Sequence, residues 1–302
     1  MIGFGAPTLS WNLLSDLRQL FDYPFMVHAI EAGTIVAVLA AAVGWFTVLR
    51  RETFAAHTLA VVGFPGAAGA VLLGISASAG YFVFCVGAAL VVASAGRPRS
   101  GGEGSAVIGT TQAFILGCGY LFATLYSGNL NGVDSLLFGN FLGITSAQIV
   151  TLALLALLAL AALAVMARPL LFASIDPDVA ASRGVPVRFV SVAFLVILGI
   201  AAAETSQITG SLLVFALLVL PAATAQRLTP RPGYSMAMAL VVALVVTWVG
   251  LAISYYSPYP IGFWITTVAF AGYLAAHLPR RLRPIQRRRP VLPAAELATT
   301  AL

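Results

Sequence analysis

The chain has 302 residues, of which 60% are hydrophobic and 9% are charged. Soluble domains carry roughly 25% charged residues, so this composition excludes a water-soluble globule and predicts a surface that largely faces lipid. The formal net charge of +6 comes from arginines scattered between apolar stretches, which favours a cytoplasmic membrane anchor over a nucleic-acid-binding surface.

Residues 1–24 mix polar and apolar side chains and lack the features of a cleavable signal peptide, so we expect an extracytoplasmic N-terminal segment. Nine apolar runs follow, each long enough or nearly long enough to span a bilayer as a helix. They are 25–49, 59–75, 81–95, 107–126, 149–166, 189–203, 210–225, 236–254 and 261–278. The sequence therefore predicts an all-α integral membrane protein with a transmembrane domain over residues 25–278. Residues 279–302 are basic and then rich in Ala and Thr, which predicts a disordered cytoplasmic tail.

Arginines orient the chain, which contains no lysine. With the N-terminus outside and nine crossings, only Arg18 lies outside and every other arginine faces the cytoplasm. We therefore predict an N-out, C-in topology. Several runs are short, so some spans are expected to be tilted, broken or re-entrant. The run 59–75, with Pro65 between Gly63 and Gly66, is the strongest candidate for a broken helix, and an ordinary kinked helix is the alternative.

The sequence contains no recognisable motif with which the chain itself could hydrolyse ATP or catalyse another reaction. A phosphate-binding G-x-x-x-x-G-K-[ST] loop cannot occur without lysine. The sequence also lacks a Ser-His-Asp or Cys-His arrangement in a recognisable context. We expect a transport subunit that is not an enzyme and binds no cofactor, so that any ATP hydrolysis resides in a separate polypeptide.

The loop 172–188 reads FASIDPDVAASRGVPVR and contains the signals of a short, well-capped helix. Asp176 suits the N-cap, Pro177 the first helical position, and Asp178 the positive end of the helix dipole. Arg183 falls in the last turn, and Gly184 suits the left-handed position that follows. The sequence predicts a cytoplasmic helix of about two turns. Its two interpretations are a docking element for a partner subunit and a capped surface loop without a further role.

Five segments together resemble the permease subunit of the ABC importers for zinc and manganese. They are FMVHAIEAGTIVAVLAAAVGWFTVLRR (25–51), HTLAVVGFPGAAGA (57–70), LLFGNFLGIT (136–145), IDPDVAASRGVPV (175–187) and GSLLVFALLVLPAATA (210–225). The resemblance covers about residues 25–278 and implies a homodimeric permease of the bacterial plasma membrane. It also implies a pair of cytoplasmic ATPases docked on the loop 176–188, an extracytoplasmic metal-binding delivery protein, and transport of a divalent metal ion by alternating access.

The metal ligands are where this sequence departs from that family. Its members usually carry an Asp and, four residues later, a His on the second span, shortly before a Pro-Gly or similar pair. Aligning the chain on Pro65 and Gly66 places His57 at the Asp position and Val61 at the His position. Imidazole suits zinc, and a His in place of a carboxylate disfavours manganese, so zinc is the expected cargo. The alternative for His57 is a polar helix-end residue near the cytoplasmic face.

Two further groups of polar residues are candidates for the ion path. His28 and Glu31 are three residues apart and share a face of the first span, so they are a second candidate metal site. Their alternative is that both face interfacial water. Glu204 and Gln207, at the outer end of the sixth span, are a candidate patch facing the ion or the delivery protein.

Two other transport functions remain open on the sequence alone. The loss of the second ligand at Val61 favours an ABC permease of the same fold for a metal complex or another small solute. An ion-coupled secondary transporter is the third hypothesis, but it needs coupling carboxylates buried in the spans. Only Glu31 and Glu204 come near to that requirement, both towards the outer ends of their spans.

Overall fold

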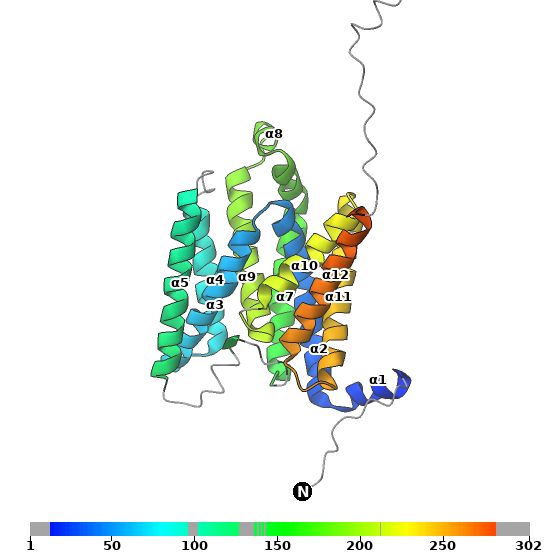
Figure 1. Cartoon of the computed structure of the whole chain (residues 1–302). Coiled ribbons are helices and arrows are strands. Elements are labelled where there is room, and N and C mark those ends of the chain that lie inside the picture. The colour runs from blue at the N-terminus through cyan, green and yellow to red at the C-terminus, as the bar shows by residue number, and fades with distance from the viewer. Residues whose placement is uncertain are drawn as a thin grey trace, which may run out of the picture.

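The computed structural model describes residues 13–95, 102–126 and 136–281, except for positions 138, 140, 142 and 212. Every regular element in this part of the chain is a helix, which confirms the all-α class (Figure 1). The helices are α1 (Leu13–Asp22), α2 (Pro24–Leu49), α3 (Thr53–Leu72), α4 (Ala77–Ala95), α5 (Gly102–Leu125), α7 (Ser146–Ile175), α8 (Pro177–Ser182), α9 (Val187–Thr209), α10 (Val214–Leu228), α11 (Pro232–Tyr255) and α12 (Ile261–Arg281).

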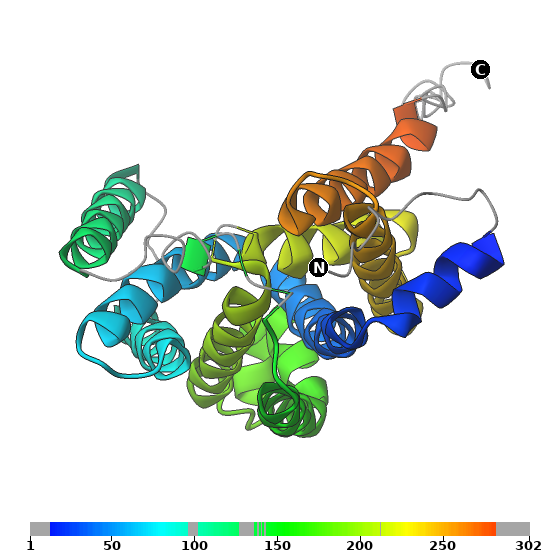
Figure 2. The ribbon, with the colours of Figure 1, turned by 90° about the horizontal axis from the view of Figure 1, so that it is seen from below.

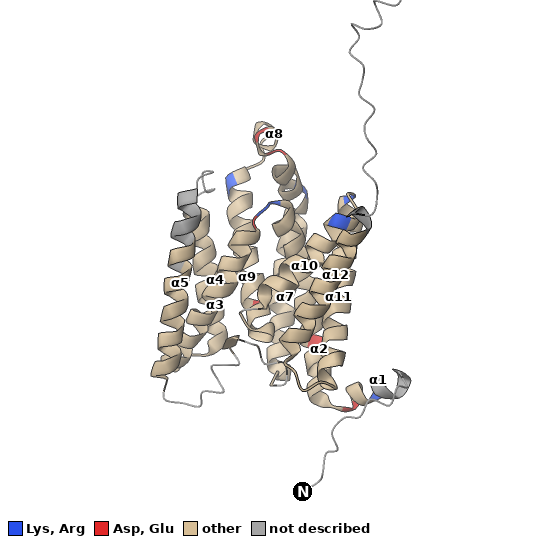
Figure 3. Cartoon of the chain, viewed as in Figure 1, with Lys and Arg blue, Asp and Glu red and all other residues tan. Residues whose placement is uncertain are grey.

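Seven of the described helices are long and apolar enough to cross a membrane, namely α2, α3, α4, α7, α9, α11 and α12. Two shorter apolar helices, the Gln112–Leu125 part of α5 and α10, coincide with the other two runs expected to span. The exact number of crossings stays a prediction. Figure 3 shows the described arginines gathered mainly at the end of the bundle that carries α8, whereas α1 lies at the opposite end. That distribution is typical of a cytoplasmic face at the α8 end.

The helix α2 forms the centre of the packing. It contacts α7, α9, α10 and α11, and most of its buried residues are alanine, glycine or valine, which allow close approach of its neighbours. Seen from below in Figure 2, α3, α4 and α5 lie on one side of the bundle and α11 and α12 on the other. A buried hydrogen bond from Trp45 Nε1 to Ser235 Oγ (3.0 Å) ties the end of α2 nearest α8 to the start of α11.

The expected break in the second span is absent, because α3 continues without interruption through Pro65. Proline removes one backbone donor and usually bends a helix, but tight packing on the surrounding helices tolerates it. A Cβ at Gly66 would collide with the side chain of Phe84 on α4, so this glycine permits the close crossing of α3 and α4. The interpretation as a broken helix is therefore wrong, and the span is one uninterrupted helix.

The structure adds detail to both predicted terminal segments. The N-terminal segment contains the helix α1, whose Leu20 is buried and which contacts α2. At the other end, α12 continues to Arg281, three residues into the predicted tail. Residues 282–302, which make up the rest of that tail, lie outside the described part of the chain.

Candidate transport and coupling sites

The short helix α8 begins with the predicted cap. Asp176 has extended backbone angles, and its Oδ1 accepts a hydrogen bond from the backbone N–H of Val179 at 3.0 Å. Pro177 occupies the first helical position, where its missing N–H costs nothing, and Asp178 lies in the first turn. Local sequence signals therefore fix where this helix starts.

The end of α8 has the hydrogen-bond pattern of a Schellman motif. Arg183 is the C-cap, directly after the last helical residue, and Gly184 has a φ of +83°. The N–H of Val185 donates to the carbonyl of Ala180 (3.1 Å), and the N–H of Gly184 donates to that of Ala181 (3.0 Å). These two bonds require a left-handed residue at position 184, which glycine supplies without steric cost.

In the bundle, α8 projects at the arginine-rich end between α7 and α9 and packs against those two helices (Figures 1 and 3). The side chain of Val179 is 44% exposed, and Asp178 and Arg183 are exposed too. The helix is therefore presented to the solvent at one end of the molecule. The two segments that flank it, the end of α7 and the start of α9, are anchored in the bundle, and we call them its stems. This is the geometry that a docking element for a partner subunit requires.

A pocket of about 620 Å³ lies beside α8. One wall comes from Pro177, Asp178 and Ala181 of α8, and further walls come from the turn between α2 and α3, the start of α3, the end of α4 and the start of α9. The pocket separates α8 from the start of α3, so these two elements face each other across open space.

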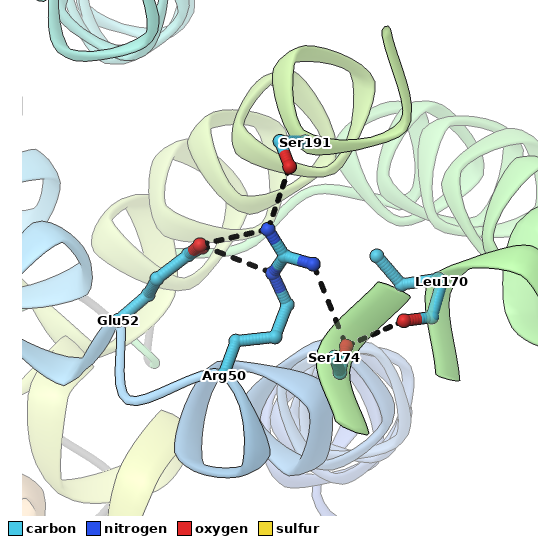
Figure 4. A network of polar contacts seen from close by, with 5 residues as sticks. All are labelled: Arg50, Glu52, Leu170, Ser174 and Ser191. Atoms are coloured by element: carbon cyan, nitrogen blue, oxygen red, sulfur yellow. Dashed lines mark hydrogen bonds and ion pairs between the residues drawn. The ribbon is translucent and has the colours of Figure 1, made fainter. Parts of the chain in front are cut away.

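The side chain of Arg50 forms a polar cluster beside this pocket that sequence reasoning missed (Figure 4). Its guanidinium pairs with Glu52 at 2.9 Å and donates to Ser191 Oγ of α9 (2.9 Å) and Ser174 Oγ of α7 (3.4 Å). The side chain of Arg50 is 1% exposed, and its charge lies 5.2 Å from the ring centroid of Phe194. A buried arginine with this set of partners is a structural anchor.

The turn that carries Arg50 repeats the cap of α8 without a glycine. Arg51 has a φ of 59° and is the one non-glycine residue with positive φ in the described part of the chain. The N–H of Glu52 donates to Thr47 O (2.9 Å), and the N–H of Arg51 donates to Val48 O (3.1 Å), which completes a Schellman motif at the end of α2. A left-handed arginine costs about 1–2 kcal/mol, so the surrounding contacts hold this turn in a strained conformation.

His57 lies in the second turn of α3, near the cytoplasmic end predicted for that helix. Its side chain is exposed, and its ring stands edge-on to that of Phe215 of α10, with the centroids 5.4 Å apart. Val61, one turn further along, is 8% exposed. The described residues contain no group of three His, Cys, Asp or Glu side chains placed to hold a metal ion, so His57 offers a single donor per chain.

His28 and Glu31 are not joined in the structure. The Nδ1 of His28 lies 3.1 Å from the carbonyl oxygen of Ile144, and its Nε2 lies 3.4 Å from Ser146 Oγ, so the ring faces the start of α7. Glu31 is exposed, and no ion pair of its carboxylate is found among the described residues. Their shared role as metal ligands stays a prediction.

Glu204 and Gln207 also face different surroundings. Glu204 is fully buried, and neither of its carboxylate oxygens has a hydrogen-bond partner among the described residues. Gln207 accepts a hydrogen bond from Ser78 of α4 at 2.6 Å. In this conformation Glu204 is enclosed by helices and Gln207 is half-buried, and their role at the outer mouth stays a prediction.

The segment 136–145 is fastened to the turn between α9 and α10. The carbonyl of Leu136 accepts from the hydroxyl of Tyr81 (2.7 Å) and from the N–H of Ser211 (3.4 Å). Gly139 and Gly210 both have positive φ, and a Cβ on either would collide with the backbone of the other segment. Two of the segments that carry the family resemblance thus meet at the end of the bundle opposite α8 (Figure 1).

A model of the ABC 3 transport family matches residues 22–279, which include every apolar helix of the bundle. The chain belongs to the ABC 3 transport family. Together with its apolar helices, this membership makes it a multi-span protein of the bacterial plasma membrane.

Individual relatives of this ABC 3 family member also match it over most of its length. It is 29% identical over 264 residues to the chelated iron transport system membrane protein YfeC of Yersinia pestis, covering 87% of this chain and 89% of that protein. It is 28% identical over 247 residues to the manganese transport system membrane protein MntC of Halalkalibacterium halodurans, covering 80% and 83%.

The fold is shared with solved structures. The chain superposes on PsaBC from Streptococcus pneumoniae in complex with Fab with a TM-score of 0.78, at 23% identity, over 87% of this chain and 95% of that one. An inward-facing conformation of a putative metal-chelate type ABC transporter matches with a TM-score of 0.66 at 16% identity, over 92% of this chain and 94% of that one.

Proposed function

We propose that the chain is the membrane-spanning permease subunit of an ATP-binding-cassette importer for a divalent metal ion. The observation that carries the proposal is the family match over residues 22–279, which takes in the whole helical bundle and the capped helix α8. Relatives that cover most of the chain are named for transport of manganese and of chelated iron. Transport proceeds by alternating access, with an ATPase supplying the free energy.

The shape of the molecule supports the partners of the proposed permease. The cytoplasmic ATPase dimer binds α8, which is exposed at the arginine-rich end while both of its stems are anchored. The extracytoplasmic delivery protein docks at the opposite end, where the segment 136–145 is fastened to the start of α10. A second copy of the chain completes the permease as a homodimer. One chain offers a single donor at His57, and a homodimer supplies two.

The cargo is a first-row transition metal ion, with zinc preferred over manganese. This preference rests on His57, because neutral imidazole binds zinc well and hard manganese poorly. The exposed ring of His57 on the inner half of α3 is free to meet an ion in a path between two copies. A site with few donor atoms binds the ion weakly. Transport requires weak binding, because a tightly bound ion would not be released.

A second candidate cargo is a metal chelate. It is favoured by Val61, which removes the second ligand of the family pattern, and by the relative named for chelated iron. A chelated ion brings its own donors and needs shape complementarity more than additional protein ligands.

Metal uptake in cells that express the chain with its neighbouring ATPase and delivery protein tests the proposal. We expect ATP-dependent uptake of labelled zinc that exceeds uptake of manganese and is lost in His57→Ala. Thr58→Ala is the matched control, since the hydroxyl of Thr58 bonds to Phe54 O within its own helix. Zinc uptake that survives His57→Ala moves the site to His28 and Glu31. Absence of uptake for both free ions, with uptake of a chelate, establishes the second candidate.

A further inference from the structure

The main contacts of α8 are not with the helix that carries His57. In the described part of the chain it packs on α7 and α9, while the pocket of about 620 Å³ lies between it and the start of α3. Displacement of α8 is therefore transmitted mainly through its two stems. Ser174, two residues before the cap Asp176, and Ser191, in the first turns of α9, are the polar groups of those stems that meet Arg50.

One guanidinium joins these stems to the turn between α2 and α3 (Figure 4). Arg50 is the C-cap of α2, and its Nε and a terminal nitrogen lie 3.1 and 2.9 Å from the carboxylate of Glu52, the N-cap of α3. The terminal nitrogens also donate to Ser191 (2.9 Å) and Ser174 (3.4 Å). Arg50 therefore connects α2, α3, α7 and α9 at a single point.

The connection is rigid. The guanidinium is planar with donors in a fixed fork, and the side chain of Arg50 is 1% exposed, so it cannot swing into solvent. It is further held over Phe194 of α9, whose ring packs against Phe46 of α2 with centroids 6.3 Å apart. The left-handed φ of Arg51 is a strained conformation that needs the surrounding contacts to hold it.

We propose that Arg50 is a positioning residue that transmits displacement of α8 to the turn between α2 and α3, and so to the helix bearing His57. The proposal rests on the proposed function, because it needs a partner ATPase that moves α8. Without this link, motion of α8 reaches α3 only through the packing of α9 on α3, and ATP hydrolysis drives transport less efficiently.

The double variant Ser174→Ala/Ser191→Ala tests the link in the complete complex reconstituted in liposomes. It removes the bonds from Arg50 to both stems but keeps the pair with Glu52, so no buried charge is left without a partner. We expect metal uptake per ATP hydrolysed to fall on the order of tenfold, with ATP hydrolysis maintained. The variant Ser174→Thr/Ser191→Thr keeps both hydroxyls and should restore the ratio. Ser94→Ala is the control, because Ser94 lines the same pocket but bonds to Val91 of its own helix.

An unchanged ratio of uptake to ATP hydrolysis in Ser174→Ala/Ser191→Ala overturns the proposal. Equal loss of uptake and of ATP hydrolysis also overturns it, since that result means the serines only maintain the fold or the docking of the ATPase.

A measurement that needs no cargo separates this proposal from the proposed function. Spin labels at Ser182→Cys on α8 and Phe54→Cys on α3, both exposed positions, report the distance between the two elements in a background without Cys85 and Cys118. We expect a narrow distribution that ATP–vanadate trapping leaves narrow, and a broad one once the two serines are replaced. If the native complex takes up no metal but shows this pattern, the proposed function fails and the transmission by Arg50 stands. If the distribution stays narrow in the double variant, the transmission is refuted whatever the cargo is.

Discussion

Arg50 and Glu52 form an ion pair of 2.9 Å across a turn of one intervening residue, and so clamp the end of α2 to the start of α3. The arginine side chain is 1% exposed and the glutamate side chain 19%. The remaining carboxylate oxygen of Glu52 is buried without a partner among the described residues, so the glutamate depends on Arg50 for its polar contacts.

Replacing Arg50 with Ala should therefore destabilise the protein by about 3–5 kcal/mol, because Glu52 is left with an uncompensated charge. Thermal unfolding of the purified protein in nanodiscs measures the loss. Arg188→Ala is the matched control, since Arg188 is exposed beside the same pocket and its removal should change stability little. Equal unfolding temperatures for the two variants would show that the pair contributes nothing beyond a surface charge.

Gly184→Val should uncouple ATP hydrolysis from transport while leaving membrane insertion intact. A β-branched residue at a φ of +83° is strained, at a cost of about 1–2 kcal/mol or more, which is enough to undo the end of a six-residue helix. Gly184→Asn tolerates the left-handed conformation and should retain coupling. Stimulation of the partner ATPase and uptake are measured together. Full ATP-driven uptake by the valine variant would refute the docking role of α8.

His57→Asp should shift the cargo preference from zinc towards manganese. The change restores the carboxylate of the family pattern, and carboxylate oxygens suit hard cations better than imidazole does. Competition between labelled zinc and manganese in the uptake assay gives the preference directly. A variant that transports both metals in the native ratio would place His57 outside the ion path.

Glu204→Met should raise the stability of the protein by about 1–3 kcal/mol, because both carboxylate oxygens are buried without hydrogen-bond partners among the described residues. Methionine is unbranched and of similar length, so the packing of α9 is kept. Chemical denaturation in detergent compares the two proteins, with the neighbouring Thr205→Val as a control that removes a hydroxyl bonded to Ala201 O. A drop in stability would reveal that the native carboxylate binds a partner, as the hypothesis of an ion-facing patch requires.

The sequence predicted those parts of the molecule whose signals are local. The helix α8 follows from three positions at its two ends, Asp176, Pro177 and Gly184, each suited to one backbone conformation. The apolar runs likewise predicted the long helices, because bilayer thickness sets their length. Pro65 was harder to interpret, since the same proline signal marks broken and continuous helices and the packing of neighbours decides between them.

The sites could not be predicted in the same way because their contacts join distant parts of the chain. Arg50 meets Ser174 and Ser191, which are 124 and 141 residues away. His28 shares a helix face with Glu31, yet its ring lies near Ile144, 116 residues further along. Helical periodicity places side chains on a face but does not say which helix packs there.

The fastening between segment 136–145 and the start of α10 has a consequence for the order of events in a transport cycle. Ser211 donates to Leu136, and Phe215, one turn further along, lies against the ring of His57. Segment 136–145 and the ring of His57 therefore contact the chain about one helical turn apart at the start of α10. If a delivery protein displaces the outer segment, we expect the surroundings of His57 to change with it, so that a ligand bound outside is sensed at His57 before any ion has moved.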